Sequence, residues 1–190
     1  LNFALSGSAS ISVQGSIYRP AENPLHDIDF DAGNANKTYL DKVLPTKFDN
    51  ITHIRTIADE KGIAACETYI TFTVPFIIET VSPNMSVYVV KHKITGKPIA
   101  SFVNSNLTIL DKNVKGKFLD FFVNSPPKFD YVKYKYKDEE LLLGNQRAAF
   151  FAKLFQYNHR IKDIWDFNRF IPNERKQVPQ VIEELTDDRR

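Results

Sequence analysis

The sequence has little of several features that would place it in a specialised class of proteins. A single cysteine, Cys66, excludes an internal disulfide and is compatible with a reducing compartment. No apolar run approaches the length of a transmembrane helix, and we recognise no signal peptide. The net charge of +2 is too small to indicate a nucleic-acid partner by itself. We therefore expect a cytoplasmic protein without a membrane partner.

Aromatic and aliphatic residues are present in ordinary to high amounts. Hydrophobic residues make up 43% of the 190 residues, and the aromatic ones include fifteen Phe and eight Tyr. A chain of this length can bury one substantial core, or a main domain with a small helical appendage. We predict a catalytic core over residues 1–137 and a helical segment over residues 138–190 that packs on it.

Two aspartates two positions apart are the most informative feature of the chain. Residues 11–14 alternate between apolar and polar and run into Gly15-Ser16, which predicts a strand that ends in a tight turn. A second short strand then carries Asp27 and Asp29. Because side chains alternate along a strand, both carboxylates point to one face and repel each other. Paired carboxylates, together with substrate phosphates, are usual ligands of Mg²⁺, so the pair predicts a metal site.

With this pair in place, the stretch resembles the nucleotidyltransferase superfamily that includes DNA polymerase β. The superfamily signature is a strand ending in Gly-Ser or Gly-Gly, a spacer, and Asp-x-Asp on the next strand. The matching positions are Gly15, Ser16, Arg19, Asp27, Ile28 and Asp29. Pro20 and His26 depart from the pattern, where members often have Gly and Ser. The resemblance implies an α+β nucleotidyltransferase fold, with a mixed twisted sheet flanked by helices and a C-terminal helical segment.

The resemblance also calls for a third acid on a neighbouring strand. We choose Asp120, which lies within Phe-Leu-Asp-Phe-Phe-Val. A carboxylate in such an apolar strand is costly to bury unless it is paired, hydrogen-bonded or bound to a metal. Glu79 and Glu67 are the alternatives, and a solvent-facing Asp120 on a half-exposed strand is the simpler structural interpretation.

Further segments have recognisable patterns. The expected elements are the end of a helix over 1–5, short helices over 38–44 and 50–60, strands over 66–123 with a hairpin around Gly96, and a helix from Asp138. Residues 131–137 alternate Tyr with Lys133, Lys135 and Lys137. We interpret them as an edge strand protected by lysines, and the alternative is a face that binds phosphates.

The predicted C-terminal helix is similar to that of AbiE-type toxin nucleotidyltransferases, which carry Lys-Leu followed by Arg-x-Lys/Arg-Asp-x-x-Asp. The matching residues are Lys153, Leu154, Arg160, Lys162, Asp163 and Asp166. The resemblance implies that Lys153 binds nucleotide phosphates and that Asp163 helps to build the active site. Without the resemblance, these charges form a solvated helix face.

These observations predict a Mg²⁺-dependent, toxin-like nucleotidyltransferase that binds an NTP such as ATP. It would transfer a nucleotidyl group to a hydroxyl of tRNA or of a protein, with an antitoxin as a possible partner. The residues assigned are Asp27, Asp29 and Asp120 for two Mg²⁺ ions, and Gly15, Ser16, Arg19, Lys153 and Asp163 for the nucleotide. The alternatives are a catalytically silent module of the same fold that binds a nucleotide, RNA or a protein, and an RNA binder that uses the Lys/Tyr strand.

Overall fold

The computed structural model describes residues 3–13, 27–58, 65–103, 106–123 and 131–144. Its elements are β1 (Ala4–Ser6), α1 (Gly7–Val13), β2 (Asp27–Asp31), α2 (Lys37–Val43), the short 3-10 helix η1 (Leu44–Thr46), β3 (Ile51–Ala58), β4 (Ala65–Phe72), β5 (Phe76–Ser82), β6 (Val87–His92), β7 (Pro98–Val103), β8 (Asn106–Ile109), β9 (Gly116–Val123), β10 (Tyr131–Tyr136) and β11 (Glu139–Gly144). These residues form two compact units. The first contains residues 27–28, 32–58, 65–103 and 106–123, and the second contains residues 3–13, 29–31 and 131–144.

The predicted fold class, an α+β nucleotidyltransferase fold with helices flanking the sheet, is wrong. Strands hold 59% of the described residues, and the only α-helices among them are two of seven residues each. The physical reason is the density of β-branched and aromatic residues from β3 onward, which fits a pleated and half-buried surface better than a helix. The described part of the chain is therefore mostly β.

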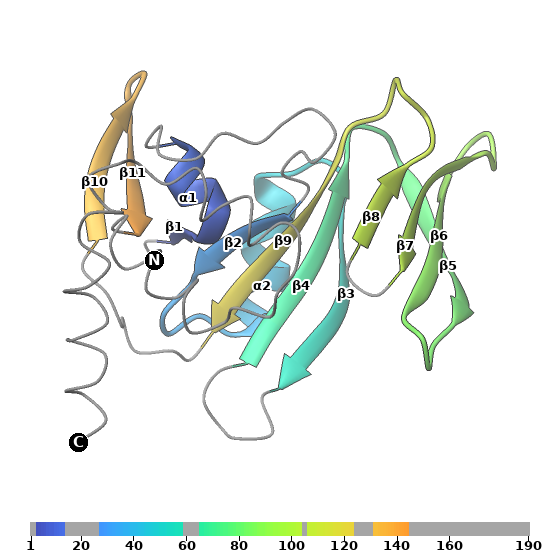
Figure 1. The fold of residues 1–190 in the computed structure, drawn as a ribbon, viewed down its shortest axis with the longest axis horizontal. Coiled ribbons are helices and arrows are strands. Elements are labelled where there is room, and N and C mark those ends of the chain that lie inside the picture. The colour runs from blue at the N-terminus through green and yellow to red at the C-terminus, as the bar shows by residue number, and fades with distance from the viewer. Residues whose placement is uncertain (1–2, 14–26, 59–64, 104–105, 124–130, 145–190) are drawn as a thin grey trace, which may run out of the picture. The chain divides into compact units, whose positions relative to one another are not determined.

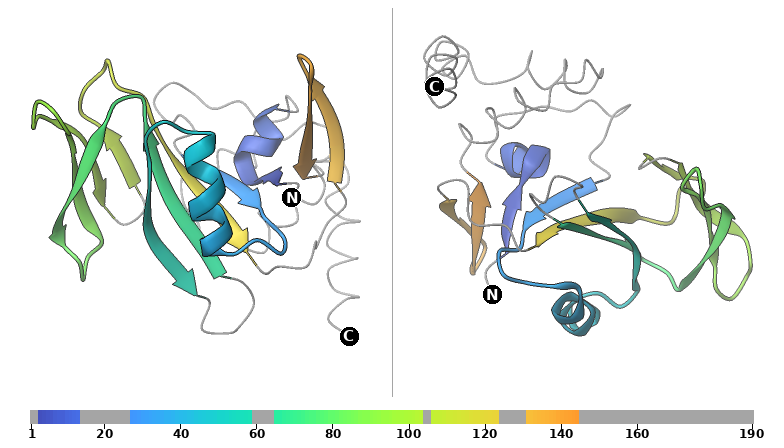
Figure 2. Two further views of the ribbon diagram at one scale, coloured as in Figure 1. Left: turned by 180° about the vertical axis from the view of Figure 1, so that it is seen from behind. Right: turned by 90° about the horizontal axis from the view of Figure 1, so that it is seen from below.

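In the first unit, β3, β4 and β9 form an antiparallel sheet, and β9 has β2 as its next neighbour (Figure 1). Ala32, just after β2, donates its backbone N–H to Phe122 O at 2.9 Å. The chain then forms α2, and Asn36 caps the N-terminus of this helix. The side chain of Asn36 accepts a hydrogen bond from Tyr39 N. Figure 2 shows α2 against one face of these strands, where Leu40 is fully buried. The predicted helix over 38–44 is thus confirmed within one residue.

The opposite face of β4 and β9 packs toward a second, four-stranded antiparallel sheet with the order β5-β6-β7-β8. The core between them consists of Ile70, Phe72, Val90, Ile99, Ala100, Phe102, Leu107, Val114 and Phe118. Gly116 begins β9 against this core. A Cβ atom at Gly116 would lie 2.3 Å from Cε1 of Phe72, so the close approach requires glycine. The predicted hairpin around Gly96 is confirmed, and β8 and β9 lie in the region predicted to form strands.

In the second unit, β10, β11, β1 and the last three residues of β2 are neighbours in that order. β1 runs parallel to β11 and antiparallel to β2. The hydroxyl of Tyr131 donates a hydrogen bond to the Asp31 carboxylate. Lys133 Nζ lies 3.5 Å from Glu140 Oε1 on the neighbouring strand. β10 stands at the end of the strand order, so the interpretation of residues 131–136 as a lysine-bearing edge strand is confirmed.

Within the range 50–60, which was predicted as a helix, residues 51–58 form the strand β3. His53 pairs with Tyr69 and Arg55 with Thr68, which leaves Ile54 as an extra residue in a β-bulge. The bulge interrupts the two-residue alternation of a strand. It therefore lets Ile54 reach the core, so that a strand accommodates isoleucines whose spacing of three in the sequence imitates a helix.

Both ends of the described chain also differ from the predictions. Residues 4–6 form a strand, not the end of a helix, and residues 7–13 form a helix, not a strand that leads to Gly15. The helix predicted from Asp138 is wrong over residues 139–144, which pair with β10 through a two-residue turn at Lys137 and Asp138. Lys137 has a φ of 54°, as the first residue of such a hairpin turn requires. The remainder of the predicted helical segment lies outside the described residues.

Candidate functional site

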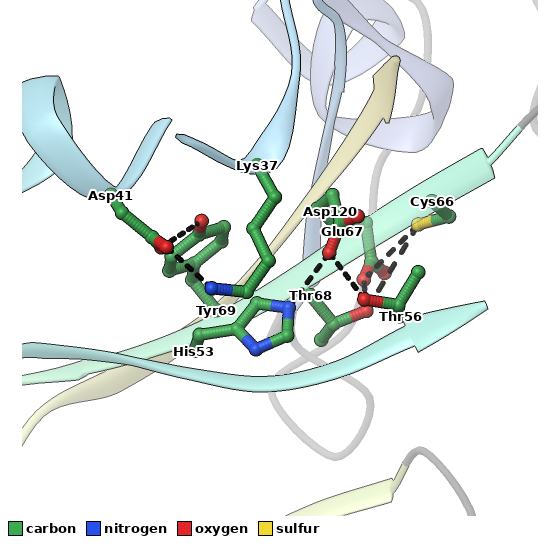
Figure 3. Close-up of polar contacts among 9 residues, drawn as sticks. All are labelled: Lys37, Asp41, His53, Thr56, Cys66, Glu67, Thr68, Tyr69 and Asp120. Carbon is green, nitrogen blue, oxygen red and sulfur yellow. Dashed lines mark hydrogen bonds and ion pairs between the residues drawn. The ribbon is translucent and has the colours of Figure 1, made fainter. Parts of the chain in front are cut away.

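Asp120 lies in the middle of β9, on the strand next to β2. It pairs with Thr68 of β4, so the two side chains share one face of the sheet. Thr68 is fully buried and donates its hydroxyl to Asp120 Oδ1 at 2.6 Å (Figure 3). The thiol of Cys66, two residues earlier on the same face, donates to the same oxygen at 3.8 Å. β4 therefore holds the Asp120 carboxyl from one side.

A second carboxylate acts on Asp120 from β2. Burial raises the pKa of Asp120, the hydrogen bond from Thr68 lowers it, and the negative charge of Asp27 raises it again. The positive charge of Arg55 on β3 and the Cys66 thiol lower it further, but the net effect is a raised pKa. The structure thus brings together two of the predicted catalytic acids, Asp27 and Asp120, within the first unit. Their mutual repulsion favours a cation between them.

Arg55 is held beside the site by packing as well as by charge. Its guanidinium carbon lies 5.3 Å from the centroid of the Phe102 ring, in the geometry of a cation–π contact. The side chain is half-buried. The bulge at Ile54 is what turns Arg55 to the face that carries Thr68. This residue was not predicted, and only the irregular strand places it there.

Asp29 lies two residues after Asp27 on β2, with Ser6 of β1 as its partner across the ladder in the second unit. The next residue, Gly7, has a φ of 61°, and a Cβ atom there would lie 2.5 Å from Asp29 Oδ2. A side chain at position 7 would therefore be strained by the backbone angle and would have to displace the Asp29 carboxylate.

Among the described residues, the strand that leads into a Gly-Ser pair is β1, which is followed by Gly7 and Ser8, whereas residues 11–13 lie in α1. Sequence reasoning missed Gly7. The signal that could have found it is the apolar run at residues 3–5, followed directly by a group of small residues.

Several predicted site residues cannot be placed, because they lie outside the described residues. They are Gly15, Ser16, Arg19, Lys153 and Asp163. Their assignment to nucleotide phosphates stays a prediction.

The two alternatives for the third acid lie elsewhere. Glu67 is on the opposite face of β4 from Asp120 and is 5% exposed. His53 Nε2 lies 2.7 Å from Glu67 Oε2, and Thr56 donates to the same oxygen at 2.7 Å. Glu79 is exposed on the edge strand β5 and pairs with Lys91. Asp120 is therefore the acid among the three that lies beside β2.

The face of the sheet under α2 carries a separate set of polar contacts, also drawn in Figure 3. Tyr69 donates its hydroxyl to Asp41 Oδ1 at 2.6 Å, and Lys37 pairs with the same carboxylate. Burial and the Asp41 charge raise the pKa of Tyr69 above its usual value, so the hydroxyl stays protonated as a donor. His53 packs edge-on against Tyr69, with 5.1 Å between ring centroids. These contacts fix α2 on the sheet.

Within the described ranges, no group of three or more His, Cys, Asp or Glu side chains is arranged to hold a metal ion, and neither α-helix has the combined length and apolarity that crossing a membrane needs. No model of a protein family matches the sequence, and a search of curated proteins finds no match either.

Proposed function

We propose that the protein is a metal-dependent nucleotidyltransferase of the cytoplasm that moves a nucleotidyl group from an NTP to a hydroxyl of tRNA or of a protein. The observation that carries the proposal is the position of Asp120. Its partly buried carboxyl is held by Thr68 and is repelled by Asp27 of the neighbouring strand. Acids in this arrangement are costly without a cation, which makes the pair a candidate for function and not only for structure.

The donor set suits magnesium. Asp27 and Asp120 offer only oxygen ligands, and Mg²⁺ commonly binds one or two carboxylates and takes its other ligands from water and substrate phosphates. Two described acids are thus sufficient on the protein side. When bound, Mg²⁺ neutralises charge on the phosphates and lowers the pKa of a coordinated hydroxyl.

The protein residues orient the site and handle a proton. Thr68 and Cys66 fix the direction of the Asp120 carboxyl, so that its second oxygen is available to the acceptor. A carboxylate whose pKa is raised by burial is a better proton acceptor than a solvated one. We assign to Asp120 the role of taking the proton of the attacking hydroxyl. The positive charge of Arg55 limits the rise in this pKa and so favours the ionised carboxylate.

The nucleotide would be held by residues outside the described ranges. Gly15, Ser16, Arg19 and Lys153 would bind its phosphates and Asp163 would complete the site, as the resemblance implies. Positive side chains and backbone amides are suited to this task because they stabilise phosphate charge without taking part in bond making.

The test compares Asp27→Asn and Asp120→Asn with a matched control, Asp49→Asn, which changes an exposed acid just before β3. Titration calorimetry with Mg²⁺ and each NTP should show binding in the wild type and in the control, and at least tenfold weaker binding in the two site variants. Transfer of an α-³²P label from the NTP to total tRNA or to protein should be lost in the same two variants. Circular dichroism melting shows whether each variant folds.

Two outcomes would contradict the proposal. Label transfer that survives in both site variants would show that these acids are not catalytic. Nucleotide, RNA or protein binding that needs no Mg²⁺, with no transfer in the wild type, would instead support a binding module without catalysis.

A further inference from the structure

Lysines gather at one end of the β5-β6-β7-β8 sheet. Residues 73–117 contain six lysines, no arginine and two acids, which gives this segment a net charge of +4. The other 145 residues of the chain together carry −2, because the total is +2. The small overall charge therefore hides a strongly basic segment.

Backbone hydrogen bonds bring the lysine-bearing connections of this segment together. Lys93, in the turn between β6 and β7, donates its N–H to Pro75 O at 2.9 Å, and Thr73 N donates to Lys115 O at 3.0 Å. Leu110 N donates to Ile99 O at 2.9 Å, which ties the β8–β9 loop to the start of β7. Figure 1 shows the β6–β7 turn and the β8–β9 loop at the same end of the sheet, and Figure 2 shows the same from behind.

Four of these side chains are exposed and define what we call the basic end: Lys93, Lys97, Lys112 and Lys115. Among the described residues, no acid forms an ion pair with any of the four. The two acids of the segment are engaged elsewhere. Glu79 pairs with Lys91, and Asp111 Oδ1 accepts from Asn113 N at 2.9 Å within its own loop. The positive charge of the basic end is thus left for a partner.

The turn that carries two of these lysines is held in one conformation. His92 N donates to Lys97 O at 2.8 Å, and Gly96, with a φ of 69°, donates to His92 O at 2.9 Å. The backbone N–H groups of Ile94 and Thr95 both donate to His92 Nδ1, at 3.1 and 3.4 Å. A fixed turn presents its lysines without the full entropy cost of ordering a loop on binding.

We propose that the basic end binds the sugar–phosphate backbone of a nucleic acid. Four exposed ammonium groups on two adjoining connections offer positive charge to several phosphates of one strand. The ammonium group of lysine acts as a point charge, so its contact with a phosphate does not depend on the neighbouring base. Among the described residues, no aromatic side chain at this end is exposed, so the basic end has no ring on which a base could stack. The contacts are therefore expected to be independent of sequence and strongly dependent on salt.

This inference goes beyond the proposed function and does not depend on it, because the basic end contains none of the proposed catalytic residues. If both hold, the acceptor hydroxyl belongs to a nucleic acid and not to a protein.

The experiment measures fluorescence anisotropy of a labelled 20-base-pair RNA duplex and of a labelled 20-nucleotide RNA, at 50 and 200 mM NaCl. Four phosphate contacts predict that affinity falls by roughly 50-fold for the single strand and about 150-fold for the duplex between these salt concentrations. The variant Lys93→Gln/Lys97→Gln should bind more weakly at 50 mM, and two lost contacts reduce its fall to about 7- to 12-fold. The matched control is Lys133→Gln/Lys135→Gln, which removes the same charge from the edge strand β10.

Each outcome supports or overturns the inference. Weaker binding and a smaller salt dependence in the first variant alone support it. An equal loss in the β10 control would show that net charge or the Lys/Tyr strand is responsible. Binding to phosphatidylserine vesicles without binding to either RNA would assign the surface to membranes, and Ile94, 81% exposed in the turn, would then be the residue inserted. Asp27→Asn should bind RNA like the wild type, which separates this test from that of the proposed function.

Discussion

Replacement of Thr68 by valine removes one hydroxyl from the site and leaves the shape of the side chain almost unchanged. Thr68 is 1% exposed and its hydroxyl donates to Asp120 Oδ1 at 2.6 Å. A hydrogen bond to a charged group contributes about 1.5–3 kcal/mol, and no cavity is created, so we expect a loss of that size in the free energy of unfolding at pH 7.5. For a protein of this size the corresponding fall in Tm is about 3–12 °C.

The loss should depend on pH in a defined direction. The bond from Thr68 lowers the pKa of Asp120 in the folded protein. The stability that it supplies is therefore present while the carboxyl is ionised and declines as the pH falls through the pKa of Asp120. The difference in Tm between wild type and Thr68→Val should be largest at pH 7.5–8 and should shrink toward pH 3.5, where the protonated carboxyl is a weaker acceptor.

The assay is thermal unfolding followed by circular dichroism between pH 3.5 and 8 in the presence of EDTA, so that no divalent cation contributes. Thr108→Val is the control, because Thr108 is an exposed threonine on β8, and a change there should stay within about 0.5 kcal/mol. A loss below about 0.5 kcal/mol at pH 7.5, or a loss that does not change with pH, would refute the reasoning about Asp120.

Two further predictions concern stability. Asp120→Asn should raise Tm at neutral pH while it abolishes transfer, because the amide still accepts from Thr68 but no longer repels Asp27. Burial raises the pKa of Asp120 in the folded protein, so ionisation of this carboxyl destabilises the fold. The gain in stability of Asp120→Asn should therefore be present above the pH range in which an ordinary aspartate titrates, and it should vanish below that range. Denaturant titration across the pH range checks this, and a variant less stable than the wild type at pH 8 would contradict it. Gly116→Ala should cost about 1–3 kcal/mol because its Cβ would overlap the Phe72 ring. Urea unfolding measures the cost, and the double variant Gly116→Ala/Phe72→Leu should lose less than the sum of the single changes if this overlap is the cause.

Local patterns predicted the elements whose stability is mostly local. The helix that begins after Asn36 has its own capping residue, and the turn at Gly96 has the backbone angle that glycine supplies at low cost. The strand that carries Asp27 was recognised for the same reason, since alternation is a property of the segment itself. These features needed no knowledge of distant contacts.

Patterns failed where a distant strand decides the outcome. The isoleucines of β3 have helical spacing in the sequence, and a strand accommodates that spacing through a bulge at Ile54, which is set by pairing with β4. The acids after Lys137 suit a helix start, but pairing of β11 with β1 and β10 gives more backbone hydrogen bonds than an isolated turn of helix. Propensity was therefore overridden by sheet formation.

The sequence by itself determined which residue types are available: a pair of acids on one strand, a third acid within an apolar strand, and an excess of lysine in residues 73–117. Tertiary structure alone decided which of them meet. It placed Asp120 beside the strand of Asp27, turned Arg55 toward the same face, and put Glu67 on the other side of the sheet. It also gathered the lysines of separate connections at one end of a sheet. The reason is that strand register and bulges are set by long-range pairing, and a shift of one residue moves a side chain from one face of the sheet to the other.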